Sequence, residues 1–466
     1  MNELSRLFEA QKEAFLNDPN PTYRVRLDRL SRLERMLGRY TARFEQAVCR
    51  DFGYRSAVET QLAELVGLKT EIQTARRQLK RWMRPVRQSA HPLLANASNR
   101  LHPQPRGVVG NVSAWNYPLL LSLQPMVSAL AAGNRCMIKV SERVPETAAL
   151  LRQCVAEFFG PDEMAVVEGD AEVAKAFCAL PFDLLVYTGS SPIGSSVMKS
   201  AAQNLTPVVL ELGGACQAVI APDARFERAI ERLLVGKFLN AGQTCIAPNT
   251  VWVHARGVEA FVREVQRQSA KLIPDASALT SIVSDAHVSR WEALVEEAKA
   301  AGAWVAAVRE PFDRLMHARQ RIPVLIVDPP LECRVCREEL FGPILLVRSY
   351  CEIEQVLDEI KRSHRDQLAL YWFDEDERRI ARVTAQLGAG GMTINDTLLH
   401  AAQVSMPFGG VGRSGMGAYH GAYGFDAMTH WVPVTRQART SLWRWLNPPY
   451  SELVKKYLKW FTHKGG

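Results

Sequence analysis

The chain has 466 residues, of which 47% are hydrophobic and 23% are charged, and its formal net charge at pH 7 is +8. This length allows two or three domains, and the mild positive charge suits anionic partners such as nucleotide cofactors, acidic substrates or membrane surfaces. A nucleic-acid-binding protein is disfavoured, because no dense Lys/Arg run is interleaved with aromatic residues and no zinc-finger spacing occurs. No apolar run approaches the roughly 20 residues that a membrane-spanning helix needs.

Cysteine usage and the N-terminus point to a reducing compartment. The nine cysteines are odd in number, and the first residues, MNELSRLFEAQKEAF, are charged and helix-like, unlike a signal peptide. A cytoplasmic protein is therefore expected. Cys333 and Cys336 form a lone CxxC in ECRVC, and without a second pair it does not predict zinc. We interpret these residues as structural thiols and expect no metal site.

The first 82 residues are predicted to be helical. Apolar residues recur at helical spacing through LSRLERMLGRYTARFEQAV and again through ETQLAELVGLKTEIQTARRQLKRWM. Pro85 and the polar stretch RQSAHPLLANASNRLHPQPRG end this region, and that stretch could hold a hairpin or a loop.

Strands and helices alternate after residue 106. Strands are predicted at GVVGNVSAW, RCMIKV, AVVEG and DLLVYTG, with helices between and after them. A second series begins at PVVLELGGACQAVIAP and continues through NTVWVHA, RIPVLIVD, PILLVRSY, LALYWF and GGMTIND. This alternation of strands and helices has the spacing of βαβ units, and it predicts doubly wound parallel sheets in two α/β domains.

The C-terminal stretch SELVKKYLKWF is amphipathic. Its apolar residues share one helical face: Leu453, Val454, Tyr457, Leu458 and Phe461. Three lysines lie away from that face, and a basic amphipathic helix of this kind can lie on a membrane surface. We favour a helix that docks on its own protein or on a partner subunit.

Three motifs carry candidate reactive groups. FLNAGQTCIAP holds Cys245 among small residues, as either a packed thiol or an accessible nucleophile. WNYP places Asn116 after a strand, where its amide could donate to an oxyanion or serve a turn. LELGG ends an apolar strand with Glu211, which is costly to bury unless it is paired or used as a general base.

Three further motifs suit a nucleotide. VYTGSSPIG puts Gly189 and Ser190 between a strand and a helix, where a pyrophosphate or a simple N-cap fits. IKVSE offers Lys139 and Glu142 at a strand end, for ribose hydroxyls or for a solvated salt bridge. EELFGP places Glu339 at a strand entrance, where the alternative is a surface turn.

One glycine motif is rejected as a dinucleotide site. Gly410, Gly412 and Gly415 match GxGxxG in FGGVGRSGMG, but the motif follows a glycine-rich loop and lacks the strand that the dinucleotide fingerprint requires. A structural or substrate-pocket loop is expected there.

The order of these motifs resembles the aldehyde dehydrogenase superfamily. WNYP, Lys139, TGS, LELGG, GQTC, ELFGP and PFGG follow one another along the chain, and the resemblance covers about residues 25 to 450. The length and the MGAYHGAYGF region are similar to the shorter, class-3-like branch. RWMRP, NAGQTC and GVGRSGMGAYHG are similar to sequences of the coniferyl-aldehyde-dehydrogenase type.

The resemblance implies a role for each motif residue. Cys245 would be the nucleophile, Glu211 the general base, and Asn116 the oxyanion donor together with the Cys245 backbone N–H. The cofactor residues it implies are Trp115, Lys139, Glu142, Gly189, Ser190, Leu212, Glu339 and Phe341, and the substrate residues are Tyr117 and Phe408. Family members usually carry lysine after LELGG, whereas this chain has Ala215. That lysine is not a reacting group, so activity is expected to survive.

The reaction implied by the resemblance is oxidation of an aldehyde to its carboxylic acid. Cys245 would form a thiohemiacetal and then a thioester, which Glu211 would help water to hydrolyse. The expected cofactor is NAD, because Glu142 disfavours the 2′-phosphate of NADP, although NADP use stays open. An aromatic aldehyde such as coniferyl aldehyde is the first substrate expected, and a medium- or long-chain aliphatic aldehyde is the second.

Three other functions were weighed. A CoA-acylating enzyme is disfavoured by Glu211, since a hydrolytic base would be unnecessary there. A thiol hydrolase without redox chemistry usually needs a histidine beside the cysteine, and no histidine motif is recognisable. An inactive NAD-binding relative is disfavoured because the reactive residues are all present.

The resemblance also predicts the domain organisation. Residues 1–85 and 107–208 would form a Rossmann-like NAD(P)-binding domain, and residues 209–410 the catalytic domain. Residues 86–106 and 425–440 would form a small β oligomerisation element, followed by a tail at 441–466. A homodimer is expected, with no nucleic-acid partner.

Overall fold

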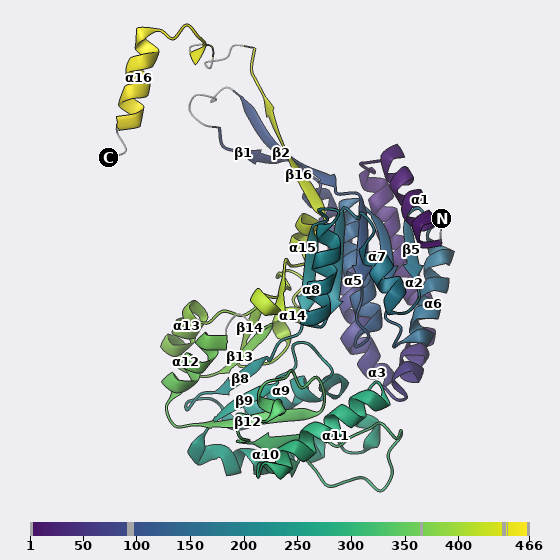
Figure 1. The fold of residues 1–466 in the computed structure, drawn as a ribbon, viewed down its shortest axis with the longest axis vertical. Coiled ribbons are helices and arrows are strands. Elements are labelled where there is room, and N and C mark those ends of the chain that lie inside the picture. Colours follow the sequence, from purple (N-terminus) through teal and green to yellow (C-terminus); the bar gives the residue numbers. More distant parts are fainter. Residues whose placement is uncertain (1–2, 91–96, 364–366, 440–443, 445, 464–466) are drawn as a thin grey trace.

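Three β-sheets organise the chain, as the computed structural model shows for residues 3–90, 97–363, 367–439, 444 and 446–463. A six-stranded and a seven-stranded sheet each form the centre of an α/β unit, and a three-stranded sheet projects from the upper unit (Figure 1). The expected fold class, two α/β domains with a small β element, is confirmed.

The first sheet has the strand order β15-β7-β6-β3-β4-β5. Its strands are β3 (Val108–Val112), β4 (Arg135–Lys139), β5 (Met164–Val167), β6 (Leu184–Gly189), β7 (Val208–Leu212) and β15 (Gly415–Met416). All neighbours are parallel except β15, which pairs antiparallel with β7. Successive residues of β4 pack into different apolar clusters, Cys136 and Ile138 on one face and Met137 on the other. Burial on both faces explains the continuous apolar strand sequences.

Helices cover both faces of this sheet. They are α1 (Glu3–Asn17), α2 (Tyr23–Phe52), α4 (Val66–Trp82), α5 (Pro118–Ala132), α6 (Pro145–Phe158), α7 (Ala171–Cys178) and α8 (Ser191–Ala202). The helical prediction for the first 82 residues is confirmed. Helix α2 buries Leu30, Leu33, Leu37 and Phe44 at helical spacing, which is the amphipathic pattern read from the sequence.

The second sheet has the order β10-β11-β12-β9-β8-β13-β14. Its strands are β8 (Gln217–Ile220), β9 (Thr250–His254), β10 (Trp304–Ala307), β11 (Val324–Val327), β12 (Ile344–Tyr350), β13 (Ala369–Phe373) and β14 (Gly391–Ile394). Its main helices are α9 (Phe226–Phe238), α10 (Val258–Leu272), α11 (Asp285–Ala300), α12 (Ile353–Ser363) and α13 (Glu377–Gln386). The edge strand β10 was not predicted, because it is short, partly exposed and antiparallel to β11.

The chain changes sheets later than the expected domain boundary. The boundary at 208/209 falls inside β7, which pairs with β6 in the first sheet. The next strand, β8, starts at Gln217 in the second sheet, so the crossing lies in the segment 213–216. The apolar run PVVLELGGACQAVIAP therefore contains two strands of different domains. The boundary is wrong by a few residues because both strands are equally apolar.

The third sheet joins two distant segments. The hairpin strands β1 (Val86–Gln88) and β2 (Ser98–Pro105) pair with each other, and β2 also pairs with β16 (Thr429–Arg436), which follows the short helix α15 (Gly421–Ala427). Both expected oligomerisation segments thus contribute to one sheet. Part of the hairpin, residues 91–96, lies outside the described residues.

Helix α16 (Glu452–His463) stands away from both α/β units (Figure 1). Leu453, Leu458, Trp460 and Phe461 are exposed, and Val454 is the buried member of the apolar face. Among the described residues this helix buries only Val454 of its apolar face, so docking of that face on its own subunit is not observed, and docking on a partner subunit stays a prediction. No helix in the described part of the chain is both long and apolar enough to cross a membrane.

A buried ion pair connects the N-terminal helices to α5. Glu64 lies in a π-helical turn, η1 (Gln61–Leu65), between α3 (Ala57–Thr60) and α4. Its Oε1 accepts from Arg55 Nη1 at 2.8 Å, and both side chains are fully buried. Its Oε2 accepts from the backbone N–H groups of Leu119 and Leu120 at 2.7 and 3.1 Å. These are two of the N–H groups that a helix start leaves without intrahelical partners, so Glu64 caps α5 from another helix.

Glu64→Ala is expected to destabilise the protein by about 3–5 kcal/mol, because it leaves the Arg55 charge buried without its partner. The measurement is the urea concentration at the midpoint of unfolding. The matched control is Glu259→Ala, which breaks the exposed Arg263–Glu259 pair and should change stability by less than about 0.5 kcal/mol. Similar small losses in the two variants would contradict the anchoring role of Glu64.

Candidate active site

The loop that carries Cys245 lies between α9 and β9, after the short helix η3 (Leu239–Gly242). Asn240 and Ala241 both have φ of 53°, a left-handed conformation that is strained for residues with a side chain. Gln243 Nε2 donates to the carbonyl oxygens of Asn240 and Ser281, each at 3.0 Å. These contacts hold the strained turn in place before the nucleophile.

Asn116 is brought to this loop by the start of α5. It is buried, and its Nδ2 donates to the Gln243 carbonyl oxygen at 3.1 Å. Its own carbonyl oxygen accepts from Asn240 Nδ2 at 2.9 Å. An amide nitrogen has two N–H donors, and the described residues supply an acceptor for one of them. The second N–H can serve a substrate oxygen.

The next residue, Tyr117, ties α5 to the same loop. Its hydroxyl lies 2.5 Å from Thr244 Oγ1, and its ring lies 5.1 Å from the Arg55 guanidinium carbon. The Arg55–Glu64 pair thus contacts both the helix start and the residue that touches the Cys245 loop.

Two buried donors hold the backbone at Cys245 and Ile246. Cys216 Sγ donates to the Cys245 carbonyl oxygen at 3.2 Å, and the Tyr371 hydroxyl donates to the Ile246 carbonyl oxygen. Cys245 itself is a half-buried free thiol. Burial raises the pKa of the Cys245 thiol, and the nearby Cys216, Glu339 and Glu211 raise it further.

Glu211 lies on β7 with its side chain buried, at 3% exposure. Neither carboxylate oxygen has a hydrogen-bond partner among the described residues. Burial therefore raises the pKa of Glu211 well above its usual value. A buried carboxyl group without internal partners has its oxygens available for a water molecule or a substrate proton.

Glu339 lies across the segment that follows β7. A side chain at Gly213 would collide with the Glu339 carboxylate, so this close approach requires glycine. Burial raises the pKa of Glu339 to about 7, against the opposing effects of the Gly214 N–H and the Arg290 and Lys237 charges. Glu339 Oε1 has no hydrogen-bond partner among the residues that the structure describes. An acceptor left open in this way fits the hydroxyl group of a ribose.

The lysine that was expected after LELGG is absent, but Lys237 reaches the same region from α9. It is buried, and burial lowers the pKa of Lys237 to about 7, while the adjacent Cys216 and Glu339 oppose the shift. A positive charge is thus available beside Glu339 from a different element of the fold.

Phe341 and Trp115 form an aromatic wall. Their ring centroids lie 5.4 Å apart in an edge-to-face arrangement, and Trp115 also packs against His287 at 5.2 Å. Phe341 has φ of 44° in the left-handed region, so its orientation is imposed by the surrounding structure. The two predicted cofactor aromatics are therefore brought together.

The remaining cofactor candidates lie at the carboxyl edge of the first sheet. Lys139 is buried, and its Nζ lies 2.7 Å from the Val140 carbonyl oxygen and 4.0 Å from Glu142 Oε2. Gly189 ends β6, and Ser190 is the N-cap of α8 without using its side chain as a cap. A helix start with open N–H groups binds phosphate well. This edge of the sheet fits a dinucleotide.

Leu212 and Phe408 have separate surroundings. Leu212 packs against Gly194 of α8 at the end of β7. Phe408 pairs through its backbone with Tyr419 and stacks on His420 at 5.3 Å. Tyr419 is buried close enough to Glu211 and Cys245 for both to raise the pKa of its hydroxyl. The predicted substrate residue Phe408 is thus linked to the reactive groups through Tyr419.

Sequence reasoning missed several of these groups. The local sequence around Arg55 and Glu64 indicates ordinary charged residues on a surface helix. The local sequence around Lys237 indicates an amphipathic helix, and that around Tyr371 an apolar strand. Gln243 and Thr244 adjoin Cys245 in GQTC, so that motif contained a usable signal. The Gly410–Gly415 loop behaves as expected: β15 at its end pairs with β7 opposite Glu211.

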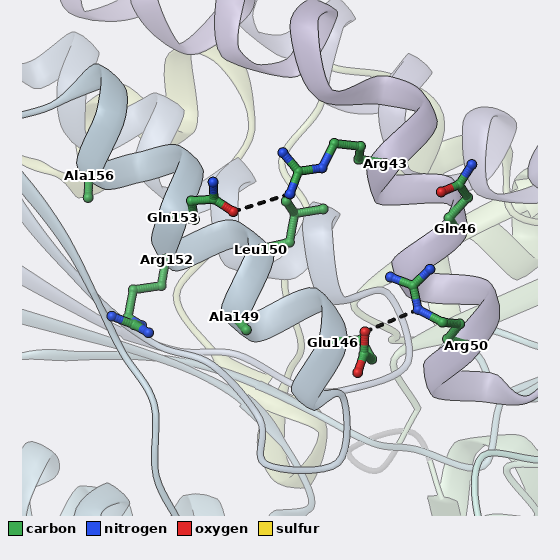
Figure 2. A pocket seen from close by; sticks show the side chains of 9 residues that line it. All are labelled: Arg43, Gln46, Arg50, Glu146, Ala149, Leu150, Arg152, Gln153 and Ala156. Atoms are coloured by element: carbon green, nitrogen blue, oxygen red, sulfur yellow. Dashed lines mark hydrogen bonds and ion pairs between the residues drawn. The ribbon is translucent and has the colours of Figure 1, made fainter.

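A separate hollow of about 540 Å³ lies between α2 and α6 (Figure 2). Arg43 donates to Gln153, and Arg50 pairs with Glu146 across it. Its arginines are therefore partly neutralised, and it contains none of the predicted site residues. Within the described ranges, no group of three or more His, Cys, Asp or Glu side chains could hold a metal ion.

The fold and the site define a nicotinamide-dependent aldehyde-oxidising class. The family model of the aldehyde dehydrogenase family matches residues 2–434, and the chain belongs to this family. It is an oxidoreductase that uses NAD or NADP, with an aldehyde as substrate.

Individual relatives resemble nearly the whole chain. A probable coniferyl aldehyde dehydrogenase of Caulobacter vibrioides is 39% identical, over 98% of this chain and 96% of the relative. A coniferyl aldehyde dehydrogenase of Pseudomonas sp. is 36% identical, over 94% and 91%. The solved substrate-bound AldH of Staphylococcus aureus is 30% identical, with a TM-score of 0.91, covering 99% of this chain and 100% of that one.

Glu211→Gln is expected to make the protein more stable than the wild type at alkaline pH. A carboxyl group with a raised folded-state pKa stabilises the fold while protonated and costs stability as it ionises. The difference should therefore grow by roughly 1.4 kcal/mol per pH unit between the unfolded and the folded pKa of Glu211. Urea unfolding midpoints of both proteins at pH 5 and pH 8 measure it. A stability difference that does not change with pH would contradict the buried, partnerless state of Glu211.

Proposed function

We propose that the protein oxidises an aromatic aldehyde, such as coniferyl aldehyde, to the carboxylic acid with NAD. The observation that carries this proposal is the convergence of Cys245, Asn116 and Glu211 around one loop. The Asn116 amide contacts the Cys245 loop at Gln243 and keeps one N–H available, and the oxygens of Glu211 lack partners among the described residues.

Cys245 begins the reaction as the nucleophile. Its sulfur adds to the aldehyde carbon, and the resulting oxyanion accepts from Asn116 Nδ2 and from the Cys245 backbone N–H. One donor of this kind typically contributes about 3–4 kcal/mol to transition-state stabilisation. The thiol must lose its proton first, which burial opposes. Glu211 can accept that proton, since burial also makes its carboxylate a stronger base.

The second half-reaction is hydrolysis. When bound, NAD supplies the hydride acceptor that oxidises the thiohemiacetal carbon, which leaves an acyl group on Cys245 as a thioester. Glu211 then removes a proton from a water molecule, whose oxygen attacks the acyl carbon. The thiol of Cys245 leaves, and the carboxylic acid is released. Water is the acyl acceptor in this proposal because Glu211 is the group beside the thioester that can activate it.

The cofactor would lie along the carboxyl edge of the first sheet. Glu339 would hold the nicotinamide ribose, with Phe341 and Trp115 beside the ring. Lys139 and Glu142 would hold the adenosine ribose, while Gly189, Ser190 and Leu212 would border the pyrophosphate. Glu142 is about half exposed and lies 4.0 Å from Lys139 Nζ. Its negative charge would repel a 2′-phosphate, which favours NAD over NADP.

Aromatic side chains support an aromatic substrate. Phe408, Tyr419 and His420 pack together next to Glu211 and Cys245, and Tyr117 contacts the residue before Cys245. Relatives that match almost the full length carry the name coniferyl aldehyde dehydrogenase. Offset or edge-to-face packing on such rings stabilises an aromatic ligand.

We further propose a homodimer in the cytoplasm. The outer strands of the three-stranded sheet, β1 and β16, each leave one edge without a strand partner among the described residues, and such edges pair readily with another chain. A partner subunit would also cover the apolar face of α16, which makes a membrane contact unnecessary. All nine cysteines are free thiols, as in a reducing compartment. Light scattering that finds a monomer at micromolar concentration would contradict the dimer.

Cys245→Ala is expected to abolish turnover while NAD binding is kept, because it removes the nucleophile and leaves the cofactor contacts in place. The assay follows absorbance of the reduced cofactor with coniferyl aldehyde, benzaldehyde and hexanal, with NAD and then NADP. The control is Cys351→Ala, which removes an exposed thiol and should retain full activity.

The same assay separates the alternatives. Turnover that survives in Cys245→Ala would contradict the mechanism. Faster oxidation of hexanal than of the aromatic aldehydes would favour an aliphatic substrate. NAD binding by the wild type without oxidation of any aldehyde would favour an inactive relative.

A further inference from the structure

The CxxC pair that the mechanism does not use lies in the segment before Glu339. Cys333 and Cys336 flank the short helix η6 (Arg334–Cys336). The backbone N–H of Cys336 donates to the Cys333 carbonyl oxygen at 3.0 Å. An i to i+3 hydrogen bond of this kind closes a turn in which the two Cα atoms lie within about 7 Å. Disulfides span Cα separations of about 4.4–6.8 Å, so the backbone geometry suits a bridge.

The Cys336 thiol turns back toward the segment that leads into Cys333. The carbonyl oxygen of Pro330 accepts from the Cys333 backbone N–H at 3.1 Å and from Cys336 Sγ at 3.5 Å. The Cys336 thiol and the Cys333 backbone N–H therefore contact the same carbonyl oxygen. Arg348 Nη1 approaches Cys336 Sγ at 3.7 Å. A guanidinium at this position favours the thiolate, although burial raises the pKa of both thiols.

The two thiols of the pair differ in solvent exposure. Cys336 is half-buried, whereas Cys333 is buried. The more exposed thiol can meet a small oxidised molecule, and the buried thiol can then resolve the product. Cys351 is the fully exposed cysteine of the chain, but no other cysteine lies at CxxC spacing from it.

The turn is connected to Glu339 through a chain of ion pairs. Arg334 lies inside the CxxC, and its Nε bonds Glu338 Oε1 at 2.7 Å. Glu338 Oε2 pairs with Arg290 Nη2 at 2.9 Å. The same nitrogen of Arg290 donates to the Glu339 carbonyl oxygen at 2.7 Å. A change of geometry in the turn therefore reaches the backbone of Glu339 through Arg334, Glu338 and Arg290.

We propose that Cys333 and Cys336 form a reversible disulfide whose closure weakens cofactor binding by displacing Glu339. The oxidant is a small disulfide such as oxidised glutathione. The Cys336 thiolate attacks one sulfur of that disulfide, which forms a mixed disulfide and releases one reduced thiol. The Cys333 thiolate then attacks Cys336 Sγ, which closes the bridge and releases the second thiol. Two cysteine thiols are oxidised to one disulfide and one small disulfide is reduced to two thiols; the two protons that leave the cysteines are taken up by the two departing thiolates. The effect on cofactor binding rests on the proposed role of Glu339.

The disulfide can be detected directly because trypsin cuts between the two cysteines. Cleavage after Arg321, Arg334 and Arg337 separates the peptides 322–334 and 335–337 unless a disulfide joins them. Full-length Cys245→Ala protein is equilibrated with mixtures of reduced and oxidised glutathione, so that oxidation of the nucleophile cannot contribute. Free thiols are then blocked before digestion. We expect the linked peptides in the oxidised sample and their loss after dithiothreitol treatment.

Cofactor binding is measured on the same samples by quenching of tryptophan fluorescence with NAD. The Kd for NAD should rise at least threefold on oxidation and return to its original value on reduction. Cys336→Ser in the Cys245→Ala background should show no such rise, whereas the matched control Cys351→Ser should keep it. Absence of the linked peptides would overturn the proposal, as would linked peptides without a change in Kd or a change that persists in Cys336→Ser.

The proposed function can fail separately. If the reduced protein does not bind NAD, the proposed cofactor role of Glu339 is contradicted, and the coupling falls with it. The linked peptides would still decide whether the disulfide forms.

Discussion

The buried pair of Arg55 and Glu64 is the interaction on which the site depends most. Glu64 fixes the start of α5 by accepting from Leu119 and Leu120, and the residues just before that start are Asn116 and Tyr117. Both oxygens of the buried Glu64 are used, one by Arg55 and the other by the first N–H groups of α5. The pair therefore fixes the start of α5, and with it the Asn116 amide that contacts the Cys245 loop at Gln243. The π-helical turn that carries Glu64 is a local irregularity of the kind found at functional sites.

A second constraint is the apolar setting of the reactive groups. Cys245, Glu211 and Glu339 all have raised pKa values because burial disfavours their charged forms. The fold thus keeps these three side chains buried, where their protonated forms are favoured. The folded state loses stability when any of them ionises. Such a conflict between stability and activity is expected where residues are selected for reaction and not for packing.

Much of the fold and of the site was predictable from local sequence. The strand and helix alternation, the three sheets' segments and the motif residues were expected, because apolar periodicity and glycine-rich turns are properties of short segments. The misplaced boundary inside β7, the missed strand β10 and the undocked helix α16 have a common cause. Pairing partners and packing faces are set by residues distant in sequence. Arg55, Lys237 and Tyr371 were missed for the same reason, since each reads as an ordinary member of its own element.

The sequence by itself determined the family, the candidate site residues and the two α/β units, since motif order and periodicity are properties of the linear chain. The tertiary structure alone decided which groups meet. Cys216, just before β8, contacts the Cys245 carbonyl from 29 residues earlier in the chain, and Lys237 lies near Glu339 although the expected lysine after LELGG is missing. Hydrogen bonds and burial act between atoms that are close in space, whereas sequence motifs record only neighbours along the chain.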